Sequence, residues 1–169
     1  MQESIWMETA DAVIAHDLEL AAHGGSLGLR DAGLLESALA RPINIWTYAE
    51  SKPSLALLAA AYAFGISSNH PFIDGNKRTA LLVSFAFLDV NGSEVNASQE
   101  DAFLTILGLA AGEISEEQLS QWFEQTTAPP LTLSSFSTAP AKLFPCPPTF
   151  RCRIDSSPVS ASKSPGKQS

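Results

Sequence analysis

The chain has 169 residues and a formal net charge of −8, but charge is distributed unevenly along it. Residues 1–128 carry 5 basic and 17 acidic side chains, a balance of −12, whereas residues 129–169 carry 5 basic side chains and one acid. Such an acidic segment repels phosphate backbones, so direct nucleic-acid binding is not expected. There is no apolar run of about 18 residues and no leader pattern, so we expect a cytoplasmic protein without a membrane span.

Composition also divides the chain into two parts. Residues 1–128 are long enough for one compact core, and we predict a single domain there. Residues 129–169 hold 8 of the 11 prolines and 9 serines, which predicts a disordered, basic tail. Both cysteines, Cys146 and Cys152, lie in that tail, so neither a disulfide scaffold nor a zinc site is expected.

The first third of the chain predicts two helices. Over residues 6–20 a spacing of three and four predicts a helix whose buried stripe is Trp6, Ala10, Val13, Ile14, Asp17 and Leu18. The glycine-rich residues 23–28 favour a turn. Asp31 is a candidate cap for a second helix, which buries Leu34, Leu35, Ala38 and Leu39 and ends before Pro42. Residues 44–53 have no clean period and predict a loop.

Two further helices have almost no polar face. Residues 54–68 are apolar on every side of a helix, which predicts a position at the centre of the fold. A second nearly all-apolar helix follows over residues 76–90 and stops at Asn91-Gly92. The polar residues 69–78 join these two helices, so this loop is a candidate position for a catalytic site.

The remaining residues of the predicted domain complete an all-α architecture. Residues 91–96 alternate polar and apolar side chains, which favours a short extended piece. Ser98 with Asp101, and Ser115 with Gln118, resemble capping boxes at the starts of two more helices. We therefore predict about six helices around a buried central helix.

The loop between the two central helices concentrates unusual residues. Gly75 permits a positive φ and a close approach of a ligand to the backbone. Asn76 and Lys77 open a helix, whose unpaired N–H groups and positive dipole end suit an anion. Lys77 and Arg78 are two of only five basic residues in residues 1–128, a cluster that points to phosphate.

Three other side chains of the loop fit the same chemistry. Asp74 offers a hard oxygen ligand suited to Mg²⁺ that also contacts substrate phosphates. His70 can act as a general base near neutral pH. Phe72 is expected to pin the loop to the core. Taken singly, each residue is common in a structural connection between two helices. Their joint presence within nine residues favours a functional loop.

Other polar residues are weaker candidates for a functional role. His16 and Asp17 form a pair, but the partner residues that a metal site needs are missing from the sequence around them, so no metal is expected there. His23 is expected to face solvent. Arg30 and Arg41 can pair with acids or reach a phosphate, and the sequence does not choose between these two roles.

The loop His70-Pro71-Phe72-Ile73-Asp74-Gly75-Asn76-Lys77-Arg78 resembles the signature loop of the Fic/Doc family, His-x-Phe-x-Asp/Glu-Gly-Asn-x-Arg, at every fixed position. Further segments resemble the death-on-curing (Doc) toxins of type II toxin–antitoxin systems: residues 16–17, 24–28, 34–36, 77–81 and 111–115. The resemblance covers roughly residues 5–126. It implies a Fic/Doc-like catalytic domain that uses ATP and Mg²⁺.

The resemblance also implies a role for each residue of the loop. His70 would deprotonate a hydroxyl of the target protein, and Asp74 would hold Mg²⁺. Gly75, Asn76 and the helix N-terminus would bind phosphates, and Lys77 and Arg78 would neutralise the charge that develops during transfer.

Two positions favour a kinase over an adenylyltransferase. Adenylyl-transferring members usually have glycine where this chain has Lys77 and arginine where it has Leu81, and Doc-like toxins share both differences. The resemblance implies phosphorylation of translation elongation factor Tu and thereby inhibition of translation. An adenylyltransferase and a non-catalytic binding module with the same fold are the alternatives.

The resemblance further implies control by a partner protein. The inhibitory motif of many Fic proteins, Ser/Thr-x-x-x-Glu-Gly/Asn, is not matched here, because Ser4 and Glu8 are followed by Thr9. We therefore expect a cognate antitoxin whose C-terminal segment becomes ordered in a groove near the loop.

Overall fold

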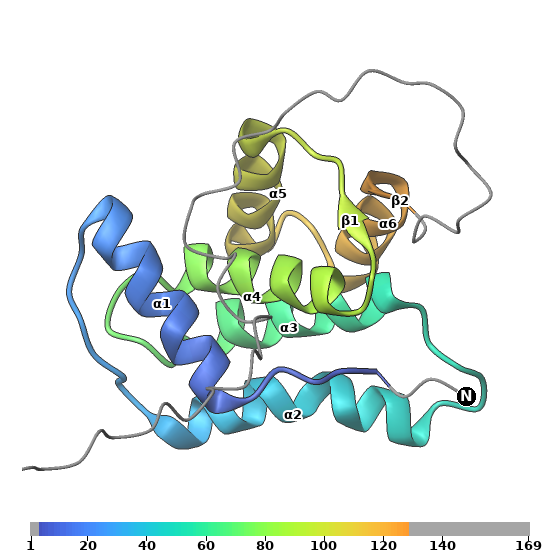
Figure 1. Ribbon diagram of the computed structural model, residues 1–169, viewed down its shortest axis with the longest axis horizontal. Coiled ribbons are helices and arrows are strands. Elements are labelled where there is room, and N and C mark those ends of the chain that lie inside the picture. The colour runs from blue at the N-terminus through green and yellow to red at the C-terminus, as the bar shows by residue number, and fades with distance from the viewer. Residues whose placement is uncertain (1–3, 129–169) are drawn as a thin grey trace, which may run out of the picture. The chain divides into compact units, whose positions relative to one another are not determined.

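A computed structural model describes residues 4–128, and the predicted tail over residues 129–169 lies outside them. Six helices and two short strands make up the described residues (Figure 1). In chain order they are α1 Thr9–His23, α2 Ala32–Tyr48, α3 Leu55–Asn69, α4 Asn76–Val90, β1 Glu94–Val95, α5 Gln99–Ala111, α6 Glu116–Thr126 and β2 Thr127–Ala128. The prediction of an all-α architecture of about six helices is confirmed for this part of the chain.

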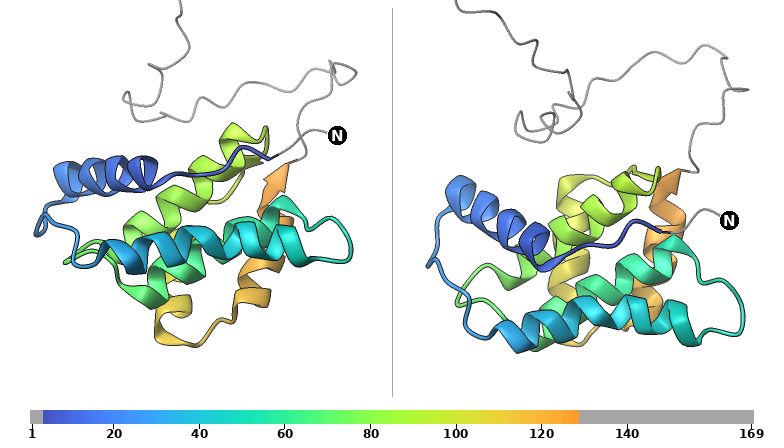
Figure 2. Two further views of the ribbon diagram at one scale, coloured as in Figure 1. Left: turned by 90° about the horizontal axis from the view of Figure 1, so that it is seen from below. Right: turned by 60° about the horizontal axis from the view of Figure 1, so that its bottom comes forward.

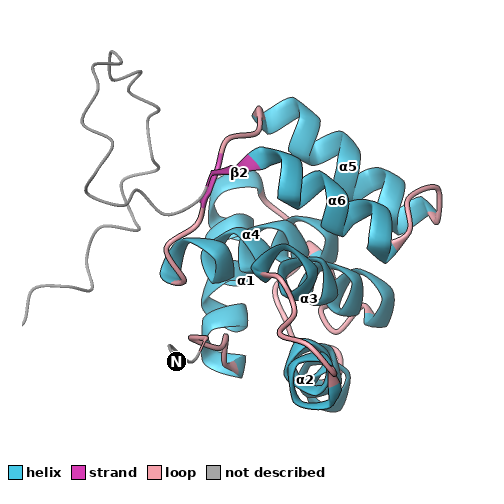
Figure 3. Ribbon diagram, turned by 90° about the vertical axis from the view of Figure 1, so that its right-hand side faces the viewer, coloured by secondary structure: helices cyan, strands magenta, loops and turns pink. Residues whose placement is uncertain are grey.

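Helix α3 is the central helix, as predicted. It packs against α2, α4, α5 and α6, and the end-on view in Figure 3 shows α2 on one side of it with α5 and α6 beyond the other. It buries large side chains such as Tyr62 and also small ones, with Ala59, Ala60 and Ala61 fully buried. At Gly65 a Cβ atom would lie 3.0 Å from the Cα atom of Ala38, so the missing side chain lets α2 and α3 approach closely. The loop that follows α3 is thus attached at one end to the buried central helix.

The predicted stripe of the first helix is wrong. Helix α1 begins at Thr9, where a capping box between Glu8 and Asp11 starts it, and not at Trp6. Its buried residues are Ala12, Ala15, His16 and Leu20, while Ile14 is 48% exposed. The segment before α1 is extended, and Trp6 packs there against Trp46 and Phe87.

The predicted end of the second helix is also wrong, because α2 continues through Pro42 to Tyr48. A proline inside a helix costs about 3 kcal/mol or more. Here Pro42 is buried, and the turns after it are held by packing of Ile45 and Trp46 against the core. The irregular connection predicted over residues 44–53 is therefore confined to residues 49–54 (Figure 2).

The C-terminal elements follow the capping signals with one exception. Ser115 and Gln118 form the predicted capping box of α6. Ser98 caps α5, since its hydroxyl accepts a hydrogen bond from the Asp101 N–H. The second bond of a capping box is missing, and the Asp101 carboxylate instead accepts from Trp122 Nε1 at 2.9 Å. The short extended piece predicted over residues 91–96 contains β1, which pairs antiparallel with β2.

Within residues 4–128, the helices are too short or too polar to cross a lipid bilayer.

Candidate active site

The candidate site is the loop between α3 and α4, and its two ends have left-handed backbone. His70 ends α3 with φ 48° and ψ 56°, and Gly75 precedes α4 with φ 74°. Among the described residues, His70 is the one residue other than glycine with a positive φ. Such a conformation is disfavoured for a side chain with a Cβ atom and occurs at functional sites more often than elsewhere.

The middle of the loop is anchored in the core, as predicted for Phe72. That side chain is 2% exposed. The Asn76 side chain holds the backbone of the same residue, since Oδ1 accepts from the Phe72 N–H at 2.9 Å and Nδ2 donates to the Phe72 carbonyl at 2.9 Å. Asn76 thus uses its amide oxygen and one amide N–H within the loop, and its backbone N–H remains for a phosphate.

His70 is exposed and has one ring nitrogen free for chemistry. Its Nδ1 atom lies 3.2 Å from the backbone oxygen of Ser68. A carbonyl oxygen only accepts, so this contact favours the tautomer with the proton on Nδ1. The lone pair is then on Nε2, which has no hydrogen-bond partner among residues 4–128. The arrangement suits a general base.

Asp74 is exposed beside the start of α4. One carboxylate oxygen accepts from the Gly75 N–H at 2.6 Å, and the other faces the Ser26 N–H at 3.4 Å. These two hydrogen bonds, chiefly the one from Gly75, hold the pKa of Asp74 below its ordinary value, and the positive charge of Arg78 adds to the effect. Asp74 is therefore ionised at neutral pH, as a metal-binding carboxylate must be.

The lowered pKa predicts an acid-dependent effect of the substitution Asp74→Asn. The pKa of this carboxyl in the folded chain lies below the value of about 3.9 expected for the unfolded chain, so its stabilisation is present above that pH. It is lost as the pH falls through the folded-state pKa. In urea unfolding from about pH 2 to pH 7, the wild type should be more stable than Asp74→Asn near neutrality, with the difference shrinking below about pH 4. A difference independent of pH would contradict this assignment.

The two basic residues of the loop differ in their surroundings. Lys77 is exposed on the first turn of α4. Arg78 is half-buried and donates from both terminal nitrogens to the carbonyl of Gly24, at 3.3 and 3.2 Å. The first N–H groups of any helix lack intrahelical acceptors, so the start of α4 joins backbone donors with two cationic side chains. An anion would be attracted to this end of the helix.

Sequence reasoning missed a second layer of the site, the connection between α1 and α2. It runs beside the loop, where the Gly28 carbonyl accepts from Ile73 N–H at 3.0 Å and the Pro71 carbonyl accepts from Arg30 N–H at 2.7 Å. Leu29 and Phe72 form an antiparallel bridge. The glycines had indicated a turn, but nothing local to them indicated which segment they would contact.

His16 also lies at this loop, a position that the sequence did not indicate. It is 1% exposed and lies beneath the loop, stacked on Phe72 with ring centroids 4.1 Å apart and planes at 8°. Its Nε2 atom is 3.1 Å from the Asp74 carbonyl oxygen. The spacing of Ala12, Ala15, His16 and Leu20 could have indicated this face, but two alanines and a histidine make a weak apolar signal.

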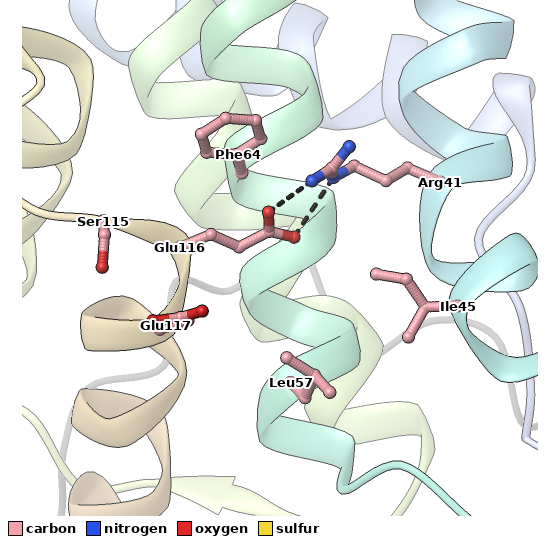
Figure 4. Close-up of a pocket in the computed structure, with 7 residues that line it drawn as sticks. All are labelled: Arg41, Ile45, Leu57, Phe64, Ser115, Glu116 and Glu117. Atoms are coloured by element: carbon pink, nitrogen blue, oxygen red, sulfur yellow. Dashed lines mark hydrogen bonds and ion pairs between the residues drawn. The ribbon is translucent and has the colours of Figure 1, made fainter. Parts of the chain in front are cut away.

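The remaining polar residues that the sequence singles out have a variety of surroundings. No cluster of three or more His, Cys, Asp or Glu side chains that could hold a metal ion occurs within residues 4–128. His23 is exposed, as predicted. Arg30 donates to the Asn69 carbonyl at 3.0 Å. Arg41 pairs with Glu116 and lies over Phe64 in a separate pocket of about 480 Å³ between α2, α3 and α6 (Figure 4).

Comparison with known proteins shows which family this chain resembles. A model of the Fic/DOC family matches residues 6–88, which include the whole loop. The chain is 42% identical over 76 residues to the Toxin Doc of Mycolicibacterium smegmatis, a match that covers 45% of this chain and 58% of that toxin. It is 37% identical over 105 residues to the Protein kinase doc of Escherichia phage P1, covering 62% of this chain and 82% of that protein. A relative matched over four fifths of its length, together with an intact loop, places this chain in the Fic/Doc family.

Proposed function

We propose that this chain is a Doc-type toxin whose α3–α4 loop transfers a phosphate from ATP to a hydroxyl of a protein. By resemblance the target is translation elongation factor Tu, and the consequence is inhibition of translation. The observation that carries the proposal is the intact loop, with a free His70 Nε2 atom beside the cationic start of α4. The names of the two relatives support a toxin and a protein kinase.

The roles of the side chains follow from their surroundings. His70 accepts the proton of the target hydroxyl at Nε2, since Nδ1 is held by the Ser68 carbonyl. Lys77 and the backbone N–H groups at the start of α4 bind the phosphates, with Gly75 allowing close approach and Asn76 contributing its backbone. Arg78, which donates a hydrogen bond to the Gly24 carbonyl, adds positive charge beside the phosphates.

The residues present fit a magnesium ion. Mg²⁺ is held by one or two carboxylates together with substrate phosphates and water, and an exposed, ionised Asp74 next to a phosphate site meets that requirement. When bound, the ion neutralises charge on the phosphates. Asp74 is the residue that would hold it.

Transfer of a phosphate is preferred over transfer of AMP. A glycine in place of Lys77 would leave the backbone open to a phosphate, whereas Lys77 adds a long cationic side chain at that position. The arginine expected of an adenylyltransferase is replaced by the half-buried Leu81. Both substitutions change the positions at which phosphates can be held, and they favour presentation of the terminal phosphate.

Control by a separate antitoxin completes the proposal. Glu8, the acid of the partial match to the inhibitory motif, lies at the N-cap of α1, where its backbone N–H donates to the Asp11 carboxylate at 2.9 Å. An antitoxin whose C-terminal segment binds in a groove near the loop would then hold the toxin inactive. Coexpression with the antitoxin would restore growth.

The mass of the modified target tests the proposed reaction. The full chain is incubated with ATP, Mg²⁺ and purified elongation factor Tu, and the intact mass of the factor is measured. We expect the addition of one phosphoryl group. Addition of an adenylyl group would favour the second candidate function, and an unchanged mass would favour a binding module.

A further inference from the structure

His16 contacts three positions of the loop from below. Its ring stacks on Phe72, its Nε2 atom reaches the Asp74 carbonyl, and its Cδ2 atom lies 3.7 Å from where a Cβ atom of Gly75 would be. The ring is oriented from its other side, because Nδ1 lies 3.2 Å from a carboxylate oxygen of Asp17. Both neighbours only accept hydrogen bonds, so the Asp74 carbonyl is bonded when a proton is on Nε2, and the Asp17 carboxylate is bonded as well only when the ring carries both protons.

The contact with the Asp74 carbonyl acts on the residues that bind phosphate and metal. That carbonyl belongs to the peptide group between Asp74 and Gly75, and the N–H of the same peptide group donates to the Asp74 carboxylate at 2.6 Å. The orientation of this one peptide group therefore sets both the carboxylate and the entry into α4. His16 is buried, so its hydrogen bond to this carbonyl is shielded from water and opposes rotation of the peptide.

We propose that His16 is a positioning residue, which fixes the Asp74–Gly75 peptide through its Nε2–H and so holds the Asp74 carboxylate in place for the metal. The proposal rests on the proposed function for the identity of the metal and the phosphate donor. His16 does not touch the reacting atoms. It acts as the outer partner that orients a ligand, and loss of such partners costs about 10 to 100-fold in metal affinity or activity.

Two substitutions separate the hydrogen bond from packing. His16→Phe keeps a flat ring on Phe72 but removes the donor, whereas His16→Gln loses the stack and keeps an N–H near the position of Nε2. His23→Phe is the matched control, because it makes the same change at an exposed histidine of the same helix. Phosphate transfer, binding of ATP with Mg²⁺ by calorimetry, and hydrogen–deuterium exchange of residues 72–78 are measured for each full-length chain.

We expect His16→Phe to weaken Mg²⁺-dependent ATP binding and the transfer rate by about 10 to 100-fold. Exchange in residues 72–78 should accelerate while exchange in α3 stays unchanged, and His16→Gln should recover part of each loss. Wild-type binding and exchange in His16→Phe would overturn the proposal. Equal losses in both variants would also overturn it, because the N–H group that His16→Gln retains would then have restored nothing.

A measurement on the unaltered chain covers the case in which a variant does not fold. Nitrogen-15 NMR of the wild type should show a slowly exchanging Nε2–H of His16, and a rapidly exchanging or absent signal would overturn the proposal. If the wild type binds ATP but transfers no phosphate, the proposed kinase function fails. The exchange, binding and NMR results still decide the role of His16 in that case.

Discussion

Replacing His70 by alanine is expected to slow phosphate transfer by about 10² to 10⁴-fold, the usual contribution of a general base. The Nε2 atom of His70 has no partner among the described residues and is the one basic nitrogen of the loop with a free lone pair. The side chain is exposed, so its removal leaves the core intact. Toxicity in growing cells should disappear, while urea unfolding stays within about 1 kcal/mol of the wild type.

The left-handed backbone at this position calls for a control. Alanine tolerates φ 48° less readily than histidine does, whereas asparagine adopts this region several-fold more often than most residues. His70→Asn removes the base and keeps the backbone preference. Equal loss of transfer in the two variants assigns the effect to the base. A variant that transfers phosphate at the wild-type rate would contradict the mechanism.

Replacing Phe72 by alanine is expected to lower the free energy of unfolding by about 3–5 kcal/mol, the range for large aromatic residues in a core. Phe72 is 2% exposed and stacks on His16, and its backbone is held by Asn76. The cavity would lie directly beneath the loop. Phosphate transfer should therefore fall as well, even under conditions in which the chain stays folded.

Phe103→Ala is the matched control for this prediction. Phe103 lies on α5 and is 48% exposed, so the same truncation there should change the free energy of unfolding by less than about 1.5 kcal/mol. Both variants are compared by urea unfolding. Similar values for the two would show that Phe72 does not anchor the loop.

The loop and the two helices on either side of it could be predicted because their signals are local. An all-apolar run predicts a central helix whatever surrounds it, and α3 is central for that reason. The polar residues from His70 to Arg78 are contiguous, so their proximity in space needed no knowledge of the fold. Capping signals at Asp31 and Ser115 are likewise local, and both are confirmed.

What could not be predicted depends on contacts between distant segments. His16 lies 58 residues before Asp74 in the chain, and no local pattern relates the two. Helix α2 passes through Pro42 because packing after the proline outweighs the local signal to stop. Asp101 bonds to Trp122 on another helix and not to its own helix start. In each case a tertiary contact decided between local alternatives.

The position of the transferred phosphate tests the central claim most directly. Purified full-length chain is incubated with elongation factor Tu, Mg²⁺ and ATP labelled at either the γ- or the α-phosphate. Transfer of the γ-label alone, abolished by His70→Asn, is the result that the Lys77-containing loop predicts. Transfer of the α-label, or of neither label by an intact folded chain, would contradict it.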